Sequence, residues 1–413
     1  MTIEWQNFYA DRTRHMKGSQ IRQYFALTER PEVISFAGGF PGNEFFPSDD
    51  ISAALAKLVK EESKLALQYT STEGHFELRN YLAGKMNSNG ASINADHVII
   101  TDGSQQGIDL LSRVLINSGE AVLVEEPAYI GGMGAIKSYG GVPVGIPMDS
   151  NGPIPAKMEV IINDQIRKGN RPKVFYTVPN FQNPTGITTS AERRRAVLDL
   201  AYRYNIIIIE DDPYGELCYE GSVPESYMSI DKKEQVIYLG SYSKILIPGI
   251  RIGWMAGPRQ LIEKVSLAKQ TTNLCSSSLG QQLAFRLSDE GYVDRHVEKL
   301  IGLYRNKREI MLKAMKQYFP TDIEYSKPRG GFFVWVKFPA YYPPSKDILE
   351  YALQHNVAYV HGEGFYSNSI GGSHGARFSF SQPTAEQISI GIATLGKILH
   401  EVKANLTLKA VGQ

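Results

Sequence analysis

Apolar residues follow two patterns between about residue 50 and residue 290, and together these predict alternating helices and strands. Apolar positions three or four residues apart predict helices at residues 51–62, 76–87, 105–116 and 191–204, the last opened by Thr189 with Glu192 three residues on. Short, almost wholly apolar runs predict buried strands, at residues 98–101, 121–125, 142–146, 174–178, 206–210, 236–239 and 252–256. Such strands, mostly separated by helices, are typical of a mainly parallel sheet that helices cover on both faces. The sequence therefore predicts an α/β fold.

The pattern changes after about residue 290. The elements predicted here are one long helix at residues 292–318, a hairpin around Gly330-Gly331, a helix at 348–355, a strand at 377–380, and a last helix opened by Thr384 with Gln387. We expect these elements to form a smaller α+β domain.

The composition is that of an ordinary globular protein. Hydrophobic residues make up 42% and charged residues 21% of the chain, which excludes the disordered and fibrous classes. The 44 lysines and arginines nearly balance the 43 aspartates and glutamates, whereas a nucleic-acid or membrane-surface partner favours a basic excess. The two cysteines and the eight scattered histidines show no metal-ligand spacing, and no stretch resembles a signal peptide or a membrane span. We therefore expect a cytoplasmic protein without a metal, a membrane partner or a nucleic-acid partner.

Polar residues follow several of the predicted strands, where parallel α/β sheets bind their ligands. Ser104 and Gln105 open a helix directly after the strand at 98–101, and free N–H groups at such a helix start favour an anion. An ordinary helix cap is the alternative. Asp211 follows the strand at 206–210, where its carboxylate is able to pair with a protonated ring nitrogen. Taken alone, an aspartate in this position is more often a simple turn or cap residue.

Lys244 lies among groups that suit a phosphate. Ser241, Ser243 and Arg251 supply hydroxyl donors and a guanidinium fork on both sides of it. A desolvated lysine in a cation-rich pocket has a lowered pKa and becomes a nucleophile that forms Schiff bases. Together with Asp211, and with Asn183 as a donor to a ring hydroxyl, these groups describe a site for pyridoxal 5′-phosphate (PLP).

Five motifs carry a resemblance to a known family. Residues 241–244 (Ser-Tyr-Ser-Lys), followed by 248–254, resemble the lysine motif of the fold-type I, class I/II aminotransferases. Residues 176–180, 183–186 (Asn-Pro-Thr-Gly) and 210–214 are placed as in that family. Residues 35–41 and 67–69 resemble the subgroup of 2-aminoadipate and kynurenine aminotransferases, which also includes the catalytic domain of MocR-type regulators. The resemblance extends from about residue 15 to residue 400.

This resemblance implies a domain organisation and a mechanism. It implies a mostly parallel, PLP-binding large domain at residues 46–290 and a smaller α+β domain at 291–413, with residues 1–45 packing against the smaller domain so that both chain ends build it. Lys244 is expected to carry the cofactor and to move the proton during transamination, and Asp211 to pair with the pyridine nitrogen. Asn183 and Tyr214 are expected to bond the ring oxygen, and Tyr129 to stack on the ring. The phosphate ligands are expected to be Ser104, Gln105, Ser241, Ser243 and Arg251, joined by Tyr69 of the neighbouring subunit in a homodimer.

The resemblance also implies how substrates bind. Arg377 is expected to take the substrate α-carboxylate by a bidentate contact, with Gly39 contacting substrate through its backbone and Asn183 nearby. Arg22 lies where some subgroup members place an arginine facing a side-chain carboxylate. It favours 2-aminoadipate or glutamate as the amino donor, with a 2-oxo acid such as 2-oxoglutarate as the acceptor. The aromatic residues Phe36, Phe40 and Tyr69 equally suit an aromatic or branched donor, so the substrate stays open.

Several other functions fit the sequence less well. Residues 241–244 also match the Ser-x-x-Lys motif of penicillin-interacting enzymes, but Lys-Thr-Gly is absent and the motif follows a strand rather than opening a helix. Gly132 and Gly134 lack the third glycine of a dinucleotide-binding motif. An amino-acid-sensing regulator would need a DNA-reading module, for which no room is left when the motifs begin near residue 35. Another reaction of the same fold, such as β-elimination or decarboxylation, stays open.

Overall fold

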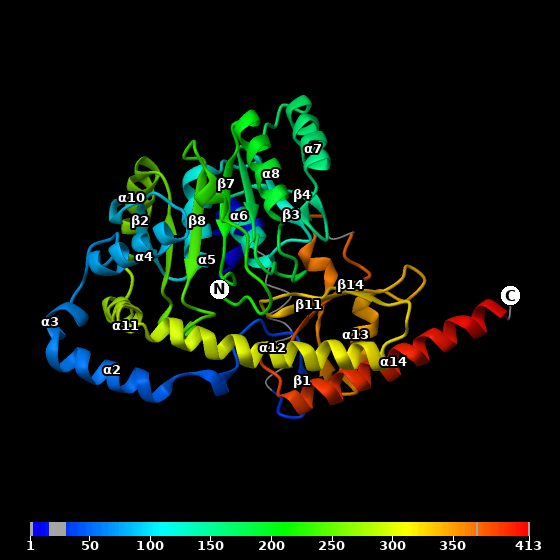
Figure 1. The fold of residues 1–413 in the computed structure, drawn as a ribbon. Coiled ribbons are helices and arrows are strands. Elements are labelled where there is room, and N and C mark those ends of the chain that lie inside the picture. The colour runs from blue at the N-terminus through cyan, green and yellow to red at the C-terminus, as the bar shows by residue number, and fades with distance from the viewer. Residues whose placement is uncertain (1–2, 16–29, 369–370, 412–413) are drawn as a thin grey trace.

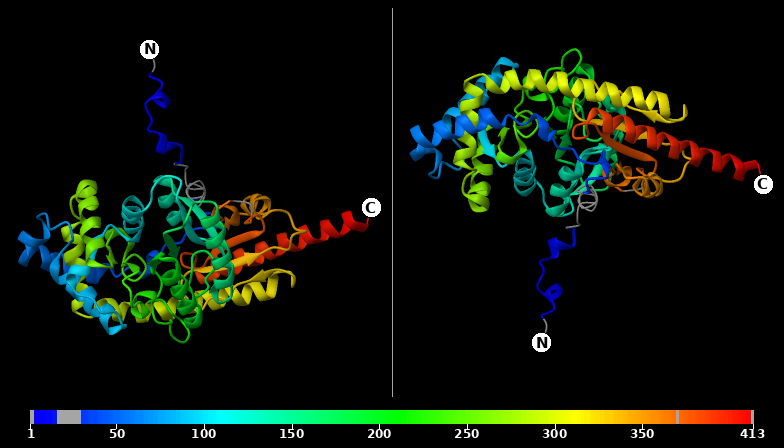
Figure 2. Two further views of the ribbon diagram at one scale, coloured as in Figure 1. Left: turned by 90° about the horizontal axis from the view of Figure 1, so that it is seen from above. Right: turned by 90° about the horizontal axis from the view of Figure 1, so that it is seen from below.

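The computed structural model describes residues 3–15, 30–368 and 371–411. Figure 1 shows one large sheet among helices and a smaller group of strands beside two long helices. Residues 3–10 extend outward from the rest of the described chain (Figure 2).

In the described residues, the largest sheet has eight strands in the order β2-β9-β8-β7-β6-β3-β4-β5. Their bounds are β2 (Val98–Thr101), β3 (Ala121–Glu126), β4 (Val142–Asp149), β5 (Gly152–Pro153), β6 (Val174–Thr177), β7 (Ile207–Asp211), β8 (Val236–Ser241) and β9 (Gly253–Ala256). The five strands from β8 to β4 pair in parallel, whereas β9 is antiparallel to both of its neighbours. The predicted α/β fold with a mostly parallel sheet is therefore confirmed.

Helices cover both faces of this sheet, which explains why its strands are apolar throughout. Along β7, Ile208 packs with α7 (Pro155–Arg167), α8 (Ala191–Tyr204) and α9 (Tyr227–Ile230), whereas the next residue, Ile209, belongs to the core on the other face. That second core includes α5 (Ser104–Leu115) and α6 (Ile130–Ser138). Because side chains alternate along a strand, an almost wholly apolar run serves two cores at once.

Both the N-terminal and the C-terminal parts of the chain contribute strands to the smaller group. An antiparallel sheet has the order β10 (Glu324–Tyr325), β11 (Phe333–Lys337), β14 (Gly375–Ser379), β13 (Val360–His361). Near the N-terminus, β1 (Ile34–Ser35) pairs in parallel with β12 (Val357–Ala358). The long helices α12 (Tyr292–Tyr318) and α14 (Ala385–Val411) lie side by side along this part (Figure 1). The domain boundaries at residues 45 and 290 stay a prediction.

One local prediction needs correction. Ser190, not Thr189, caps α8, because the Ser190 hydroxyl accepts the N–H of Arg193. Thr189 is buried, and its backbone N–H donates to the carbonyl of Pro179. The strand predicted at 252–256 is present as β9, and it runs antiparallel because the short connection from β8 reverses the chain.

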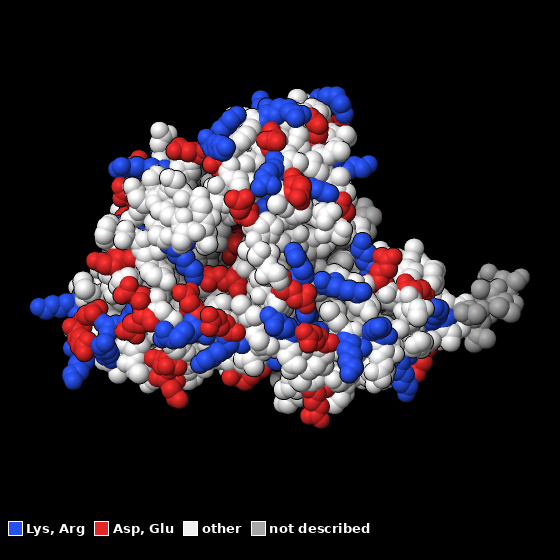
Figure 3. Space-filling model, viewed as in Figure 1, with Lys and Arg blue, Asp and Glu red and all other residues white. Residues whose placement is uncertain are grey.

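The remaining helices are α2 (Ser48–Glu61), α3 (Ser63–Ala66), α4 (Phe76–Ser88), α10 (Arg259–Asn273), α11 (Ser278–Asp289) and α13 (Ser345–Gln354). Within the described ranges, no helix is both long enough and apolar enough to cross a membrane. Acidic and basic side chains are interspersed over the face shown in Figure 3, in keeping with the balanced charge of the sequence.

Candidate active site

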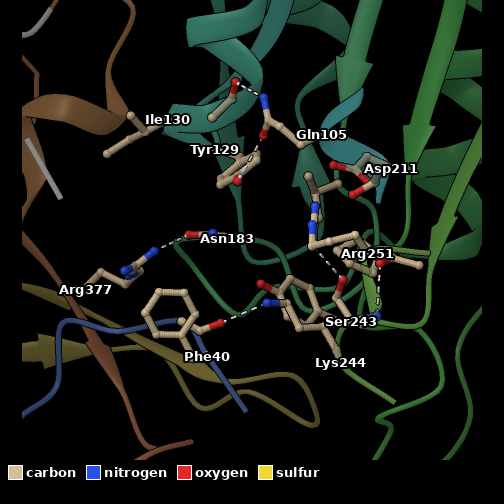
Figure 4. A pocket seen from close by; sticks show the side chains of 17 residues that line it. Phe40, Gln105, Tyr129, Ile130, Asn183, Asp211, Ser243, Lys244, Arg251 and Arg377 are labelled. Atoms are coloured by element: carbon tan, nitrogen blue, oxygen red, sulfur yellow. Dashed lines mark hydrogen bonds between the residues drawn. The ribbon is translucent and has the colours of Figure 1, made fainter. Parts of the chain in front are cut away.

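A cavity of about 370 Å³ lies where several strands of the large sheet end (Figure 4). Residues that immediately follow β2, β7 and β8 line it, together with residues from the small sheet and from the loop after β1. The residues expected from the sequence that line this cavity are Gly39, Ser104, Gln105, Tyr129, Asn183, Asp211, Tyr214, Ser241, Ser243, Lys244, Arg251 and Arg377. Their convergence on one cavity is an observation, whereas their roles toward a cofactor and substrate stay predictions.

Two expected residues are not part of this cavity. Tyr69 follows α3 and its side chain is 77% exposed on the surface, so it does not reach the cavity of its own chain. Arg22 lies outside the described residues.

Lys244 enters the cavity from the loop between β8 and β9. Its Nζ donates a hydrogen bond of 3.0 Å to the backbone carbonyl of Gly39. Burial, together with the positive charges of Arg251 and Arg377, lowers the pKa of Lys244 to about 8, against the opposing charge of Asp211. A lysine with this pKa has a substantial neutral fraction near physiological pH and is a competent nucleophile.

Asp211, at the end of β7, presents one carboxylate oxygen without a partner. Its Oδ2 accepts a 2.7 Å hydrogen bond from the Tyr176 hydroxyl, whereas its buried Oδ1 has no hydrogen-bond partner among the described residues. Burial, helped by the neighbouring charge of Asp212 and opposed by the hydrogen bond from Tyr176, raises the pKa of Asp211 to about 7. A buried, unpaired carboxylate oxygen beside a cavity is suited to a cationic N–H donor of a ligand.

A group of hydrogen-bond donors lies at the start of α5, around the Arg251 guanidinium. Gly103 has φ +75°, and a Cβ there would lie 2.5 Å from Nη2 of Arg251. The same Nη2 donates to the carbonyl of Asp102 at 2.9 Å, and Nη1 donates to the Ser243 hydroxyl at 3.4 Å. The guanidinium is thereby held beside Ser104, the first residue of the helix, where free N–H groups favour an anion.

Tyr129 and Gln105 form another part of the wall. The Tyr129 hydroxyl donates to Oε1 of Gln105 at 3.3 Å, and Gln105 Nε2 donates to the carbonyl of Gly131 at 3.0 Å. Gln105 therefore connects the start of α5 to the start of α6. Figure 4 shows this pair on the side of the cavity across from Lys244.

Arg377 on β14 reaches from the small sheet to the loop that carries Asn183. Its Nη1 donates to Oδ1 of Asn183 at 2.9 Å, and Nη2 donates to the carbonyl of Ala37 at 2.6 Å. The guanidinium lies 4.4 Å from the ring centre of Phe333, and its Nε has no hydrogen-bond partner among the described residues. Burial lowers the pKa of Arg377 to about 10. A buried arginine with a free N–H suits a carboxylate ligand.

The structure also places residues in the site that sequence reasoning missed. Ile130, Gly131, Val178 and Pro213 line the cavity, and Tyr176 bonds Asp211. Phe40, which the sequence suggested for an aromatic donor, also lines the cavity. Tyr176 lies near the end of β6, next to β7, so its position beside a strand end was a usable signal. Among the described residues, no group of His, Cys, Asp and Glu is arranged to hold a metal ion.

Comparison with known proteins identifies the family. A sequence model described as aminotransferase class I and II matches residues 32–395. This chain belongs to that family. The predicted amino-acid aminotransferase activity is therefore confirmed at the level of the family and the reaction.

Individual relatives cover almost the whole aminotransferase chain. It is 37% identical over 401 residues to aromatic-amino-acid aminotransferase 1 of Thermococcus litoralis, covering 97% of this chain and 96% of the relative. A crystal structure of Pyrococcus horikoshii kynurenine aminotransferase in complex with PMP is similar with TM-score 0.92 and 37% identity, covering 96% of this chain and 98% of that one. The α-aminoadipate aminotransferase of Thermus thermophilus, complexed with N-(5′-phosphopyridoxyl)-L-leucine, is similar with TM-score 0.88 and 32% identity, covering 97% of this chain and 100% of that one.

Proposed function

We propose that this aminotransferase binds PLP in the cavity through Lys244, and transfers the amino group of an L-amino acid to a 2-oxo acid. The observation that carries the proposal is that Lys244, the unpaired Oδ1 of Asp211 and the donors around Arg251 all face one cavity. A lysine, a carboxylate and an anion site are the three groups that an aldehyde, a ring nitrogen and a phosphate require. The solved relatives that bind PMP and a phosphopyridoxyl compound support the same cofactor.

Each end of the cofactor has its own residues. Arg251, Ser104, Gln105, Ser241 and Ser243 would hold the phosphate, and Tyr129 would lie against the ring. Asp211 would accept the N–H of the ring nitrogen on its free Oδ1, while Tyr176 keeps the other oxygen occupied. Asn183 and Tyr214, which also line the cavity, would donate to the ring oxygen.

The reaction then depends on where the chain holds protons and charges. When bound, the cofactor supplies an electron sink for the substrate's α-carbon. Arg377 binds the substrate α-carboxylate and so fixes the orientation of the α-carbon. Lys244 Nζ, neutral for part of the time because its pKa is about 8, would take up the proton from that carbon and hold it for return in the next step.

For the substrate side chain, we propose that aromatic and large aliphatic donors are preferred. Phe40 and Ile130 line the cavity, and its three described cations, Lys244, Arg251 and Arg377, already have roles. In the described lining, no further cation is left for a side-chain carboxylate. An acidic donor, and the distal carboxylate of 2-oxoglutarate, would therefore depend on Arg22.

A panel of donors against 2-oxoglutarate tests this function. We expect phenylalanine and leucine to give their oxo acids with higher kcat/KM than 2-aminoadipate, with matching conversion of the cofactor to its amine form in the absence of acceptor. Arg22→Ala should lower kcat/KM for 2-aminoadipate and leave leucine within about twofold, since one ion pair in a pocket contributes about 1–3 kcal/mol. If no donor converts the cofactor, the transaminase assignment of the site is wrong. Equal losses on both donors would reject the role of Arg22.

We also propose a homodimer in which Tyr69 completes the phosphate site of the other subunit. Leu65, Leu67 and Tyr69 expose 57%, 63% and 77% of their surface next to one another in the chain, which suits a surface that a second copy covers. Tyr69→Phe should raise the dissociation constant for PLP roughly tenfold, because a hydrogen bond to a charged group contributes about 1.5–3 kcal/mol.

Titration of the apoenzyme with PLP measures this constant, and sedimentation checks the dimer. Tyr341→Phe is the matched control, since Tyr341 is another exposed tyrosine and bonds Asp322. An unchanged PLP affinity in a dimeric Tyr69→Phe protein would contradict the assignment.

A further inference from the structure

A buried chain of hydrogen bonds runs behind the wall of the active-site cavity. Asp211 lines that cavity, whereas the next residue, Asp212, lines a second cavity of about 420 Å³ together with Asn180. Neither Asn180 nor Asp212 lines the active-site cavity. The two residues nevertheless belong to the segments that carry Asn183 and Tyr214 into it.

The chain of hydrogen bonds begins at Arg194 of α8, whose side chain is completely buried. Its guanidinium donates to the carbonyls of Thr189, Pro179 and Glu225 at 3.1, 3.3 and 3.1 Å. It also donates to Oδ1 of Asn180 at 2.5 Å. Arg194 thereby fixes Asn180 to the helix that packs on the sheet.

Asn180 is in turn hydrogen-bonded to the turn that follows β7. Its Nδ2 donates to Oδ2 of Asp212 at 3.0 Å, and Oδ1 of Asp212 accepts the backbone N–H of Gly215 at 2.9 Å. One side chain, Asn180, therefore joins the loop that leads to Asn183 with the turn that contains Tyr214. Asn180 is 2% exposed, and its side chain bonds protein groups at both ends.

The loop itself has a separate anchor. Gln182 Nε2 donates to Oε2 of Glu125 at 3.1 Å, and Gln182 Oε1 accepts the backbone N–H of Thr185 at 2.9 Å. Glu125 also accepts the backbone N–H of Val178 at 3.1 Å. The shape of the loop therefore does not depend on Asn180. Beyond the pairing of β6 with β7, the hydrogen bond from Asn180 to Asp212 links this loop to the turn.

We propose that Asn180 is a positioning residue for the transamination: it sets the distance between Asn183 and Tyr214, so that both donate to the same ring oxygen of the cofactor. This inference rests on the proposed roles of Asn183 and Tyr214. Asn180 touches neither cofactor nor substrate, and it acts through these two residues.

The positioning has a spectroscopic consequence. The ring oxygen of the bound cofactor is negatively charged and lies near the protonated nitrogen that would link the cofactor to Lys244. Hydrogen bonds from Asn183 and Tyr214 to that oxygen weaken its attraction for the proton. If the two side chains no longer reach the oxygen together, the oxygen holds the proton on the nitrogen more strongly and the pKa of the nitrogen rises. The pH at which the visible absorbance of the bound cofactor changes should then rise.

Asn180→Ala in the holoenzyme tests the inference. We expect kcat to fall roughly tenfold, as for one lost hydrogen bond or a small misplacement, and the absorbance midpoint to rise by about half a pH unit or more. Asn163→Ala is the matched control, because Asn163 is a partly buried asparagine that bonds Tyr204 away from the cavity. It should leave both readouts at the wild-type values.

The effect must also depend on Asn183. In an Asn183→Ala background, Asn180→Ala should change kcat and the midpoint much less than it does in the wild type. Equal effects in both backgrounds, or a lower unfolding temperature with unchanged kcat and midpoint, would overturn the inference. If Asn183→Ala alone changes neither readout, the proposed role of Asn183 fails as well. Asn180→Ser, which is too short to join Arg194 to Asp212, is measured in the same way if the alanine variant does not fold.

Discussion

Replacing Lys244 with alanine is expected to lower kcat by about 10⁴-fold and to remove the visible absorbance of the bound cofactor, because the residue is proposed both to join PLP and to move the proton. Stopped-flow absorbance and oxo-acid production measure the two effects. Lys173→Ala is the matched control, since Lys173 is an exposed lysine paired with Glu120. An active Lys244→Ala enzyme with an unchanged absorbance spectrum would disprove the central assignment of the site.

The lowered pKa of Lys244 should make the capture of PLP by the apoenzyme depend on pH. The neutral amine is the nucleophile, and the pKa of Lys244 is lowered to about 8 from the usual 10.5. The rate at which the apoenzyme captures PLP should therefore rise with pH, with a midpoint near 8, and level off above it. A midpoint near 10 would show that Lys244 is solvated rather than held among Arg251 and Arg377.

Replacing Asp211 with asparagine is expected to lower kcat by about 10² to 10³-fold, because the amide no longer supplies the negative charge that keeps the ring nitrogen protonated. The substitution keeps the shape of the side chain and an oxygen for the Tyr176 hydroxyl. Pre-steady-state conversion of the cofactor by a donor amino acid measures the effect on the chemical step. Asp149→Asn is the control, because Asp149 is a surface carboxylate that pairs with Arg193. Wild-type kcat in Asp211→Asn would reject the pairing with the ring nitrogen.

Although Asp211→Asn is expected to lower kcat, it should raise the stability of the apoenzyme. Burial raises the pKa of Asp211 from 3.8 to about 7, so the folded state binds the proton more tightly than the unfolded state. Its stabilising contribution is present at low pH and is lost as the pH rises from about 4 through about 7. Thermal unfolding of the apoenzyme at pH 8 should therefore show a higher Tm for Asp211→Asn than for the wild type. A lower Tm would mean that the buried carboxylate is satisfied without a cofactor.

Most of the fold was predictable because each strand of the large sheet is a short, almost wholly apolar run in the sequence. A run such as residues 206–210 is apolar at almost every position, which is typical of a strand in a mostly parallel sheet that is covered on both faces. Helix α6 was not predicted, because Gly131, Gly132 and Gly134 disfavour a helix on propensity alone. In the structure, a Cβ on Gly132 would lie 2.6 Å from the ring of Tyr176. The glycine that weakens the helix is the one that lets it pack against the sheet.

The local apolar pattern of the sequence was enough to predict several residues that line the cavity, because strand ends follow from that pattern and the ends of parallel strands meet at one edge of the sheet. Asp211 is the last residue of β7, and Lys244 and Asn183 lie in the loops that follow β8 and β6. Only the tertiary structure decided how these residues are held. Tyr176 bonds Asp211, Arg377 bonds Asn183 and Lys244 bonds Gly39, across 35, 194 and 205 positions of the chain. Such contacts depend on how helices and sheets pack against each other, and no local pattern encodes that packing.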